Sequence, residues 1–287
     1  LAELRAARRW DLAVIGGGAT GLGVALDAAA RGLAVALVEA EDFAKGTSSR
    51  ATKLVHGGVR YLAQGDIGLV HEALRERSTL LANAPQLAQR LGFVVPAYRL
   101  RDLPFYGAGL KAYDVLAGRH SLGDTEWLSA QRTLQLLPTV RRSGLVGGIR
   151  YWDGQFDDAR LAVLLARTAI DRGAVAVNHC AATALLREQG QVCGVLARDA
   201  ESGEQFSLRA GCVVNATGVW VDAVRDMDRD PGAPPRTPLV APSQGVHLVV
   251  DRAFVPGSHA LMVPRTSDGR VLFAVPWLGK TILGTTD

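Results

Sequence analysis

The sequence has 287 residues, 48% hydrophobic and 21% charged, and its 32 basic and 28 acidic side chains leave a formal charge of +4. This composition is typical of a globular chain of one large or two ordinary domains with a sizeable core. It excludes a membrane-spanning helix, since no run reaches the ~18 apolar residues that a span needs. The first ten residues lack the apolar stretch of a signal peptide. The mild positive charge suits an anionic substrate or an acidic membrane face, and we expect no nucleic-acid partner.

The cysteines exclude two further kinds of site. Cys180, Cys193 and Cys212 form neither a Cys-x-x-Cys pair nor a zinc-binding spacing. We therefore expect three small buried side chains in a reducing compartment, no metal site and no redox-active cysteine pair.

The chain opens on a strand, a glycine turn, a helix and a second strand. Residues 11–15 are a short apolar run, 22–31 are rich in alanine and end before a glycine, and 33–39 are again apolar. Two strands joined by a helix within ~30 residues predict a βαβ unit with a parallel strand pair.

The glycine turn carries the pattern Gly16-x-Gly18-x-x-Gly21. Gly16 permits a tight turn, Gly18 lets the backbone approach a pyrophosphate, and Gly21 lets the helix pack on the strand. The helix N-terminus offers N–H groups and a positive dipole end to phosphates. Glu39 ends the second strand, where its carboxylate can accept from ribose hydroxyls and would repel a 2′-phosphate. The unit therefore predicts a dinucleotide site, with an ordinary strand-to-helix turn as the alternative.

Two further helices have clear boundaries. Asp66 caps a helix that continues to Ala84, with an apolar face of Ile67, Val70, Leu74 and Leu81. Asp157 or Asp158 caps a helix that continues to Arg172. It is apolar nearly all round, so we expect it to be buried. Between these helices, residues 99–150 mix short helical and loop signals.

The second half of the chain reads mainly as strands. A strand at 174–177 precedes a small meander at 181–187, 191–198 and 205–209, and another buried strand at 212–215. Residues 229–242 hold five prolines and predict a crossover. Alternating runs then predict an antiparallel sheet from strands at 246–250, 260–264, 271–276 and 281–284.

A second motif, Gly46-Thr-Ser-Ser-Arg50, leads into the run Lys53-Leu-Val-His56-Gly-Gly-Val-Arg60-Tyr61. Small hydroxyl side chains can hydrogen-bond phosphate or flavin edge atoms, and paired glycines permit close approach to a planar ring. Composition alone also permits a solvated polar loop with a capping histidine.

Residues 16–62 resemble the flavin-dependent glycerol-3-phosphate dehydrogenases of the D-amino-acid-oxidase-like superfamily. The match continues through LVHEALRERSTLLANAP, YWDGQFDDARL, VVNATGVWVD and VPWLGKTILGTTD, and covers nearly the whole chain. The segment KLVHGGVRY is specific to this group. Relatives carry further basic substrate-binding residues and a closing segment beyond the position of Asp287. We therefore expect a chain that is truncated at its C-terminus.

The resemblance implies an α/β fold: a Rossmann-like FAD-binding domain, with a parallel sheet and a β-meander, interrupted by a mostly antiparallel α+β substrate domain. We expect the FAD-binding domain at 8–95 and 145–225, and the substrate domain at 96–144 and 226–287. FAD would contact the glycine turn, and Glu39 the adenosine ribose. The remaining cofactor residues would be Thr47, Ser48, Ser49, Lys53, Ala216, Thr217 and Gly218.

The implied reaction is oxidation of sn-glycerol 3-phosphate to dihydroxyacetone phosphate, with hydride transfer from C2 to flavin N5. A base must take the hydroxyl proton, and a neutral imidazole suits that role near pH 7. His56 is the first candidate and His247 the second. Arg60, with Tyr61 beside it, is expected to bind the substrate phosphate, because arginine can do so bidentately.

The electron acceptor is expected to be a quinone, with an oxidase that makes peroxide as the close alternative. An amine or amino-acid oxidase is the more distant rival, and the His-Gly-Gly-Val-Arg-Tyr segment argues against it. A truncated chain that binds FAD poorly and is not catalytic is the alternative from another class. We expect a cytoplasmic protein, with peripheral attachment to the inner face of the membrane and a homodimer left open. Residues 99–119 are the candidate membrane surface, and a solvated face explains them equally well.

Overall fold

The structure is a computed structural model that describes residues 1–5, 8–58, 62, 65–230 and 232–284. The chain divides into two compact units. Unit 1 comprises Leu1–Ala51 and Asp158–Pro242, and unit 2 comprises Thr52–Asp157 and Ser243–Asp287. Residues 52–95 and 145–157, which the sequence prediction gave to the FAD-binding domain, therefore lie in unit 2. The reason is strand pairing: β4 (Ala88–Ala97) pairs along its whole length with β6 (Gly147–Phe156).

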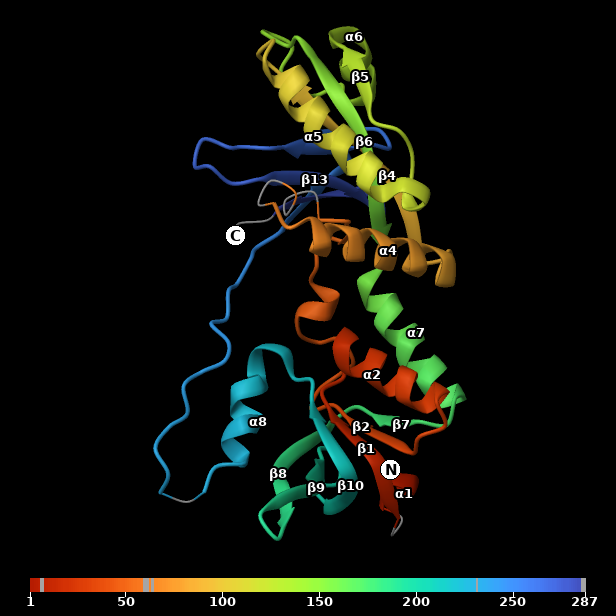
Figure 1. Cartoon of the computed structure of the whole chain (residues 1–287), viewed down its shortest axis with the longest axis vertical. Coiled ribbons are helices and arrows are strands. Elements are labelled where there is room, and N and C mark those ends of the chain that lie inside the picture. Colours follow the sequence, from red (N-terminus) through yellow and green to blue (C-terminus); the bar gives the residue numbers. More distant parts are fainter. Residues whose placement is uncertain (6–7, 59–61, 63–64, 231, 285–287) are drawn as a thin grey trace. The chain divides into compact units, whose positions relative to one another are not determined.

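Unit 1 contains a six-stranded sheet in the order β7-β2-β1-β10-β9-β8 (Figure 1). The first four strands are parallel, and β8, β9 and β10 form an antiparallel meander. This is the predicted Rossmann-like sheet with its meander. The strand bounds are β1 Arg9–Ile15, β2 Val35–Val38, β7 Val175–Val177, β8 Cys180–Glu188, β9 Gln191–Asp199 and β10 Gln205–Asn215.

Strand β10 is continuous, where the sequence predicted two separate strands. Its first half, 205–209, pairs antiparallel with β9, and its second half, 212–215, pairs parallel with β1. One strand therefore belongs to both the meander and the parallel sheet. Its last residue leads directly to Ala216, whose N–H donates to the carbonyl of Ile15 at 2.9 Å.

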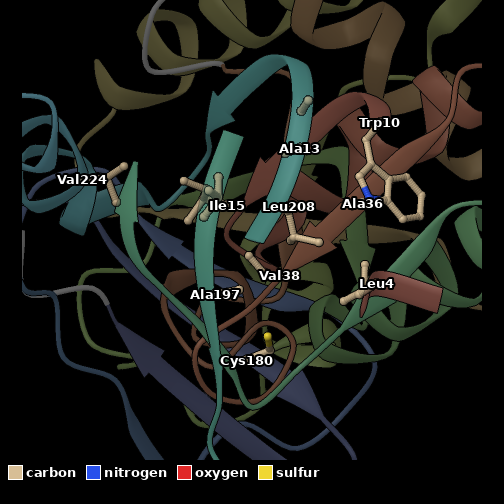
Figure 2. Packing of buried hydrophobic residues seen from close by; sticks show 12 residues of the cluster. Leu4, Trp10, Ala13, Ile15, Ala36, Val38, Cys180, Ala197, Leu208 and Val224 are labelled. Atoms are coloured by element: carbon tan, nitrogen blue, oxygen red, sulfur yellow. The ribbon is translucent and has the colours of Figure 1, made fainter. Parts of the chain in front are cut away.

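Both faces of this sheet are covered. On one face, α2 (Ala19–Ala30) and α7 (Asp158–Asp171) pack through small residues such as Ala25 and Ala166. The other face holds a core that includes Trp10, shown in Figure 2 with residues from α1 (Ala2–Arg5) and α8 (Val221–Met227).

The expectation that helix α7 is buried all round is wrong. Val163 and Ile170 are 50% and 47% exposed. The buried apolar residues are Ala162, Ala166 and Ala169, which form a stripe at helical spacing, and the half-buried Leu165 also packs against this core.

Unit 2 is built on an eight-stranded sheet in the order β11-β14-β13-β12-β4-β6-β3, with β5 also paired to β6. Among the described pairs, all are antiparallel except β12 with β4, so the sheet is mostly antiparallel as predicted. Phe93 stacks on Tyr151 in its core, with ring centroids 5.2 Å apart. The remaining bounds are β3 Leu54–Val55, β5 Glu126–Ser129, β11 Leu248–Asp251, β12 Ala260–Val263, β13 Leu272–Trp277 and β14 Lys280–Gly284.

Among the described residues of unit 2, the longer helices are α4 (Ile67–Asn83), α5 (Asp102–Ala117) and α6 (Ala130–Leu136). Helix α4 begins as predicted, since the Asp66 carboxylate accepts from the Leu69 N–H at 3.0 Å. Within the described part of the chain, no helix combines the length and hydropathy that crossing a bilayer requires.

The buried face of α4 differs in part from the predicted one. Val70 and Leu74 are buried as expected, whereas Ile67 is 55% exposed. Arg77, a charged residue, is buried on this face instead. The helix therefore places a buried cation in the interior of unit 2.

Candidate cofactor and substrate sites

The turn after β1 has no room for side chains at two of its glycines. Gly16 has φ of +109°, and a Cβ on it would lie 2.6 Å from the carbonyl oxygen of Ala216. A Cβ on Gly21 would lie 1.9 Å from the carbonyl oxygen of Gly16. The turn therefore brings β1, α2 and the end of β10 into backbone contact, which only glycine permits at these positions.

The N-terminus of α2 forms an open cradle for an anion. Its N-cap is Gly18, which has no capping side chain, and the first helical residues, Ala19 and Thr20, are exposed. The Ala19 N–H donates to the Ser48 hydroxyl at 2.9 Å. The first-turn N–H groups and the helix dipole favour a phosphate here.

Ser48 thus lies at the glycine turn, as the sequence predicted for a cofactor residue. It belongs to a 3₁₀ turn, η1 (Thr47–Ser49), in which Thr47 is exposed and Ser49 is half-buried. A Cβ on Gly46 would lie 3.1 Å from the ring of Trp220, so the loop before η1 passes close to that indole. The sequence analysis did not single out Trp220, which is 57% exposed.

Glu39 lies at the carboxyl end of β2, beside the glycine turn. Its carboxylate accepts from the N–H of Gly17 at 2.6 Å and from the N–H of Glu41 at 2.9 Å. A carboxylate has about four acceptor positions, so two donors leave capacity for ribose hydroxyls. The residue is half-buried, so its position is fixed while part of it stays accessible.

The end of β10 supplies the last predicted cofactor residues. The Thr217 hydroxyl donates to the Asn215 side chain at 2.7 Å, and the Asn215 amide donates to the carbonyl of Val221 at 2.9 Å. Gly218 follows at φ of +58° and is exposed. Asn215 therefore fixes the turn that carries Thr217. Asn215 could have been predicted from the sequence, because it is a polar residue at the end of an apolar strand.

These residues of unit 1 fit FAD. The Cβ positions at Gly16 and Gly21 are filled by neighbouring backbone, the N-cap Gly18 has no capping side chain, and a partly exposed carboxylate lies at the next strand end. A pyrophosphate needs such N–H donors, and an adenosine ribose needs such a carboxylate acceptor.

In unit 2 the structure brings together Thr52, Lys53 and His247. The Thr52 hydroxyl lies 2.8 Å from the His247 Nε2. The imidazole occupies space left by Gly284, where a Cβ would be 2.3 Å from the ring. Burial, followed by the positive charge of Lys53, lowers the pKa of His247 below 6.5. The imidazole is therefore neutral at pH 7, as a general base must be.

The other predicted residues of unit 2 lie in the segment after β3. His56 is exposed, while Gly57 and Gly58 are buried. Arg60 and Tyr61, predicted to bind the substrate phosphate, lie outside the described residues. The Gly57 N–H donates to the Asp153 carboxylate at 3.2 Å. Sequence analysis missed Asp153, because this residue lies 96 positions from Gly57 along the chain and only the folded sheet brings the two together.

Comparison with known proteins gives one family and several close relatives. The family described as FAD dependent oxidoreductase matches residues 11–287. The mitochondrial glycerol-3-phosphate dehydrogenase of Rattus norvegicus is 45% identical over an alignment of 300 positions, which covers 100% of this chain and 41% of the relative. The chain thus spans about two fifths of the length of this curated relative.

Solved structures agree on the fold. The glycerol-3-phosphate dehydrogenase from Bacillus halodurans, solved with FAD, is 36% identical with a TM-score of 0.76, covering 100% of this chain and 49% of the other. L-alpha-glycerophosphate oxidase from Mycoplasma pneumoniae is 19% identical with a TM-score of 0.71, covering 97% and 71%. The second likeness concerns the fold alone.

Proposed function

Because the chain belongs to the FAD dependent oxidoreductase family, we propose that its whole protein oxidises sn-glycerol 3-phosphate to dihydroxyacetone phosphate. The extended identity to the mitochondrial dehydrogenases supports this substrate. The observation that carries the chemistry is the position of the His247 imidazole, whose Nε2 lies 2.8 Å from the Thr52 hydroxyl and whose pKa is lowered by burial and by Lys53. The proposal concerns the whole protein because the chain spans only part of its relatives.

The residues of unit 1 would hold FAD, the cofactor of this family. Bound there, FAD supplies the acceptor, flavin N5, for the hydride that leaves C2 of the substrate. The α2 N-terminus and Ser48 would bind the pyrophosphate, and Glu39 the adenosine ribose. Thr217 and Gly218, at the end of β10, would line the same cofactor.

Two histidines are candidates for the base that removes the substrate hydroxyl proton. The geometry favours His247, because burial and Lys53 keep its imidazole neutral and the Thr52 hydroxyl orients Nε2. His56 is the alternative, since it lies on the specific KLVHGGVRY segment and is open to solvent. Lys53 and Arg60 would supply positive charge for the substrate phosphate, with Tyr61 beside them.

We further propose that the electrons pass to a quinone, at the inner face of the membrane and from a cytoplasmic protein. A quinone dissolves in the bilayer, so its reductase must reach the membrane surface. Peroxide yield during turnover tests this part of the proposal. If peroxide forms in an amount nearly equal to that of the product, the electron acceptor is oxygen and the quinone proposal is overturned. Flotation with anionic vesicles tests the membrane attachment, and sedimentation tests the homodimer.

The first experiment is anaerobic addition of sn-glycerol 3-phosphate to the purified whole protein, with the flavin absorbance recorded near ~450 nm. Bleaching is the expected result, because hydride transfer reduces the flavin. A flavin band that persists would keep the cofactor and remove this substrate. Absence of any flavin band would overturn the cofactor assignment.

Substitution distinguishes the two bases. We expect His247→Asn to slow flavin reduction by about 10²–10⁴-fold, the usual contribution of a general base. His56→Asn should then have a much smaller effect. His71→Asn is the matched control, since His71 is exposed on α4. If His56→Asn greatly slows flavin reduction and His247→Asn hardly changes it, the assignment of the base is reversed.

A further inference from the structure

Unit 2 contains a buried ion pair that the reaction does not use directly. The Arg77 guanidinium on α4 donates to the Asp153 carboxylate on β6 at 2.8 Å, and both side chains are about 2% exposed or less. Removing two charges from water costs several kcal/mol per ion, which well-packed apolar residues would avoid. The pair therefore calls for an explanation other than stability.

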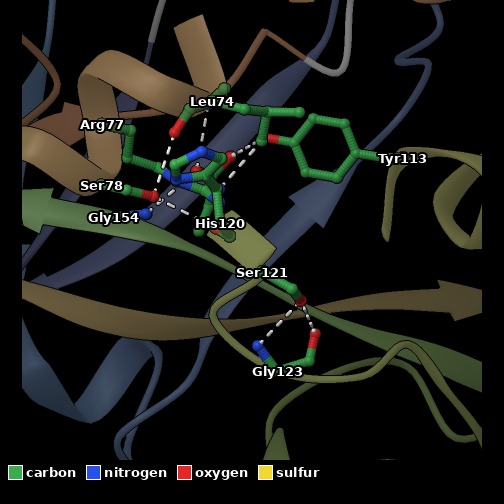
Figure 3. A network of polar contacts seen from close by, with 10 residues as sticks. Leu74, Arg77, Ser78, Tyr113, His120, Ser121, Gly123 and Gly154 are labelled. Carbon is green, nitrogen blue, oxygen red and sulfur yellow. Dashed lines mark hydrogen bonds and ion pairs between the residues drawn. The ribbon is translucent and has the colours of Figure 1, made fainter. Parts of the chain in front are cut away.

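The Asp153 carboxylate accepts hydrogen bonds from several segments, and Figure 3 labels two of the side chains that donate them, Arg77 and Tyr113. Besides Arg77, the N–H groups of Gly57 and Gly154 donate to its Oδ1 at 3.2 and 3.0 Å. The Tyr113 hydroxyl on α5 donates to its Oδ2 at 3.3 Å. Arg77 also donates to the Tyr113 oxygen at 3.2 Å and to the carbonyl of His120 at 2.9 Å. Of these donors, only Gly57 lies in the segment singled out for the substrate.

Gly57 is packed against this network as well as bonded to it. A Cβ there would lie 2.2 Å from the Tyr113 hydroxyl and 2.4 Å from Leu74 Cδ2. Burial, and then the charge of Asp153, raises the pKa of Tyr113 far above its ordinary value of 10. The phenol therefore stays protonated and remains a donor at any pH at which the protein is folded.

We propose that Arg77, Asp153 and Tyr113 are positioning residues that hold the backbone at Gly57 and thereby set where the adjoining His56 segment lies during the reaction. This role rests on the proposed function. An apolar core of the same volume would fill the space, but it would leave the Gly57 N–H buried without an acceptor. The buried carboxylate thus supplies the acceptor for the Gly57 N–H, in addition to the bond that it accepts from Gly154 within β6.

The first test compares two tyrosine variants of the whole protein loaded with FAD. Tyr113→Phe removes one donor to Asp153 and keeps the ion pair, so the protein should fold. Tyr151→Phe is the matched control: Tyr151 is equally buried, and its hydroxyl donates to Met262 instead, at 3.3 Å. Thermal unfolding, amide exchange of a peptide spanning 53–58, kcat and KM are measured for both.

We expect similar melting temperatures for the two variants. Tyr113→Phe alone should speed amide exchange in residues 53–58 several-fold. It should also lower kcat on the order of tenfold, because a small displacement of the groups around the reacting atoms slows the reaction. The proposal is overturned if Tyr113→Phe leaves exchange and kcat unchanged, or if Tyr151→Phe matches it in both. If sn-glycerol 3-phosphate does not reduce the flavin of the wild-type protein, the proposed function fails. The amide-exchange measurement then still tests whether Arg77, Asp153 and Tyr113 hold the backbone at Gly57.

A second pair of variants isolates the acceptor for Gly57. Arg77→Met with Asp153→Asn, and Arg77→Met with Asp153→Leu, both remove the two charges, so neither leaves an unpaired buried ion. Only the asparagine can still accept from the Gly57 N–H. We expect the asparagine variant to show slower amide exchange at residues 53–58 and a higher kcat than the leucine variant. Equal exchange and equal kcat in the two double variants would contradict the positioning role.

Discussion

At the scale of single residues, the glycines of α2 differ in the space around them. A Cβ on Gly21 would overlap the carbonyl of Gly16, whereas a Cβ on Gly23, two residues further along the same helix, meets nothing within 4 Å. The helix therefore tolerates alanine at one position and not at the other. The reason is contact with the turn, since helix propensity favours alanine at both.

This contrast predicts opposite effects of one substitution. Gly21→Ala should destabilise the protein by about 1–3 kcal/mol through overpacking and should lower its FAD content. Gly23→Ala should stabilise it by about 0.5–1 kcal/mol, because alanine is the better helix former. Thermal unfolding and the flavin-to-protein absorbance ratio measure both. Equal effects of the two substitutions would disprove the close contact at Gly21.

A second residue-scale prediction concerns pH. Burial, and then the positive charge of Lys53, lowers the pKa of His247, so its imidazole stays neutral to lower pH than that of an ordinary histidine. If His247 is the base, kcat/KM falls only below that lowered pKa. Lys53→Met removes the positive charge, raises the pKa and should move the acid limb of kcat/KM to higher pH, toward about 6.5. Lys45→Met, at an exposed lysine of unit 1, should not move it. A shift to lower pH would contradict the electrostatic argument.

At the scale of elements, α4 connects a capped N-terminus with the buried Arg77 two to three turns later. Asp66→Ala removes the carboxylate that accepts from Leu69 and should cost about 1 kcal/mol. Asp66→Asn keeps an acceptor and should lower the free energy of unfolding by only about 0.3 kcal/mol. Urea unfolding of the two variants measures the difference, and an equal loss in both would mean that charge, and not capping, stabilises this end.

At the scale of the whole molecule, two units with separate cores share one chain. The described residues of 229–242, before the boundary at Pro242, contain no helix or strand and are mostly exposed. Limited trypsin digestion should therefore cleave first after Arg229 or Arg236, both exposed, while buried Arg77 resists. Mass spectrometry of the first fragments identifies the site. Initial cleavage inside β4 or β6 would contradict this division of the chain.

Local patterns made the opening of the chain predictable. The glycine turn, the alanine-rich helix and the two short strands are each encoded by neighbouring residues, and Ser48 and Glu39 lie at that turn in the structure. The long strands β4 and β6 were not predicted, because Gly92 and Pro96 in β4 and the glycines of β6 interrupt the alternating pattern. The domain boundaries shifted for the same reason.

The sequence by itself determined the fold class, the dinucleotide turn and the family, since these depend on spacings of a few residues and on recognisable segments. Only the tertiary structure decided that β10 is one strand, that Thr52 meets His247 and that Asp153 holds Gly57. Such contacts join residues about 100 to 200 positions apart, at |i−j| of 96 and 195 for the last two. No local propensity encodes them, because they arise when the sheet brings distant strands into register.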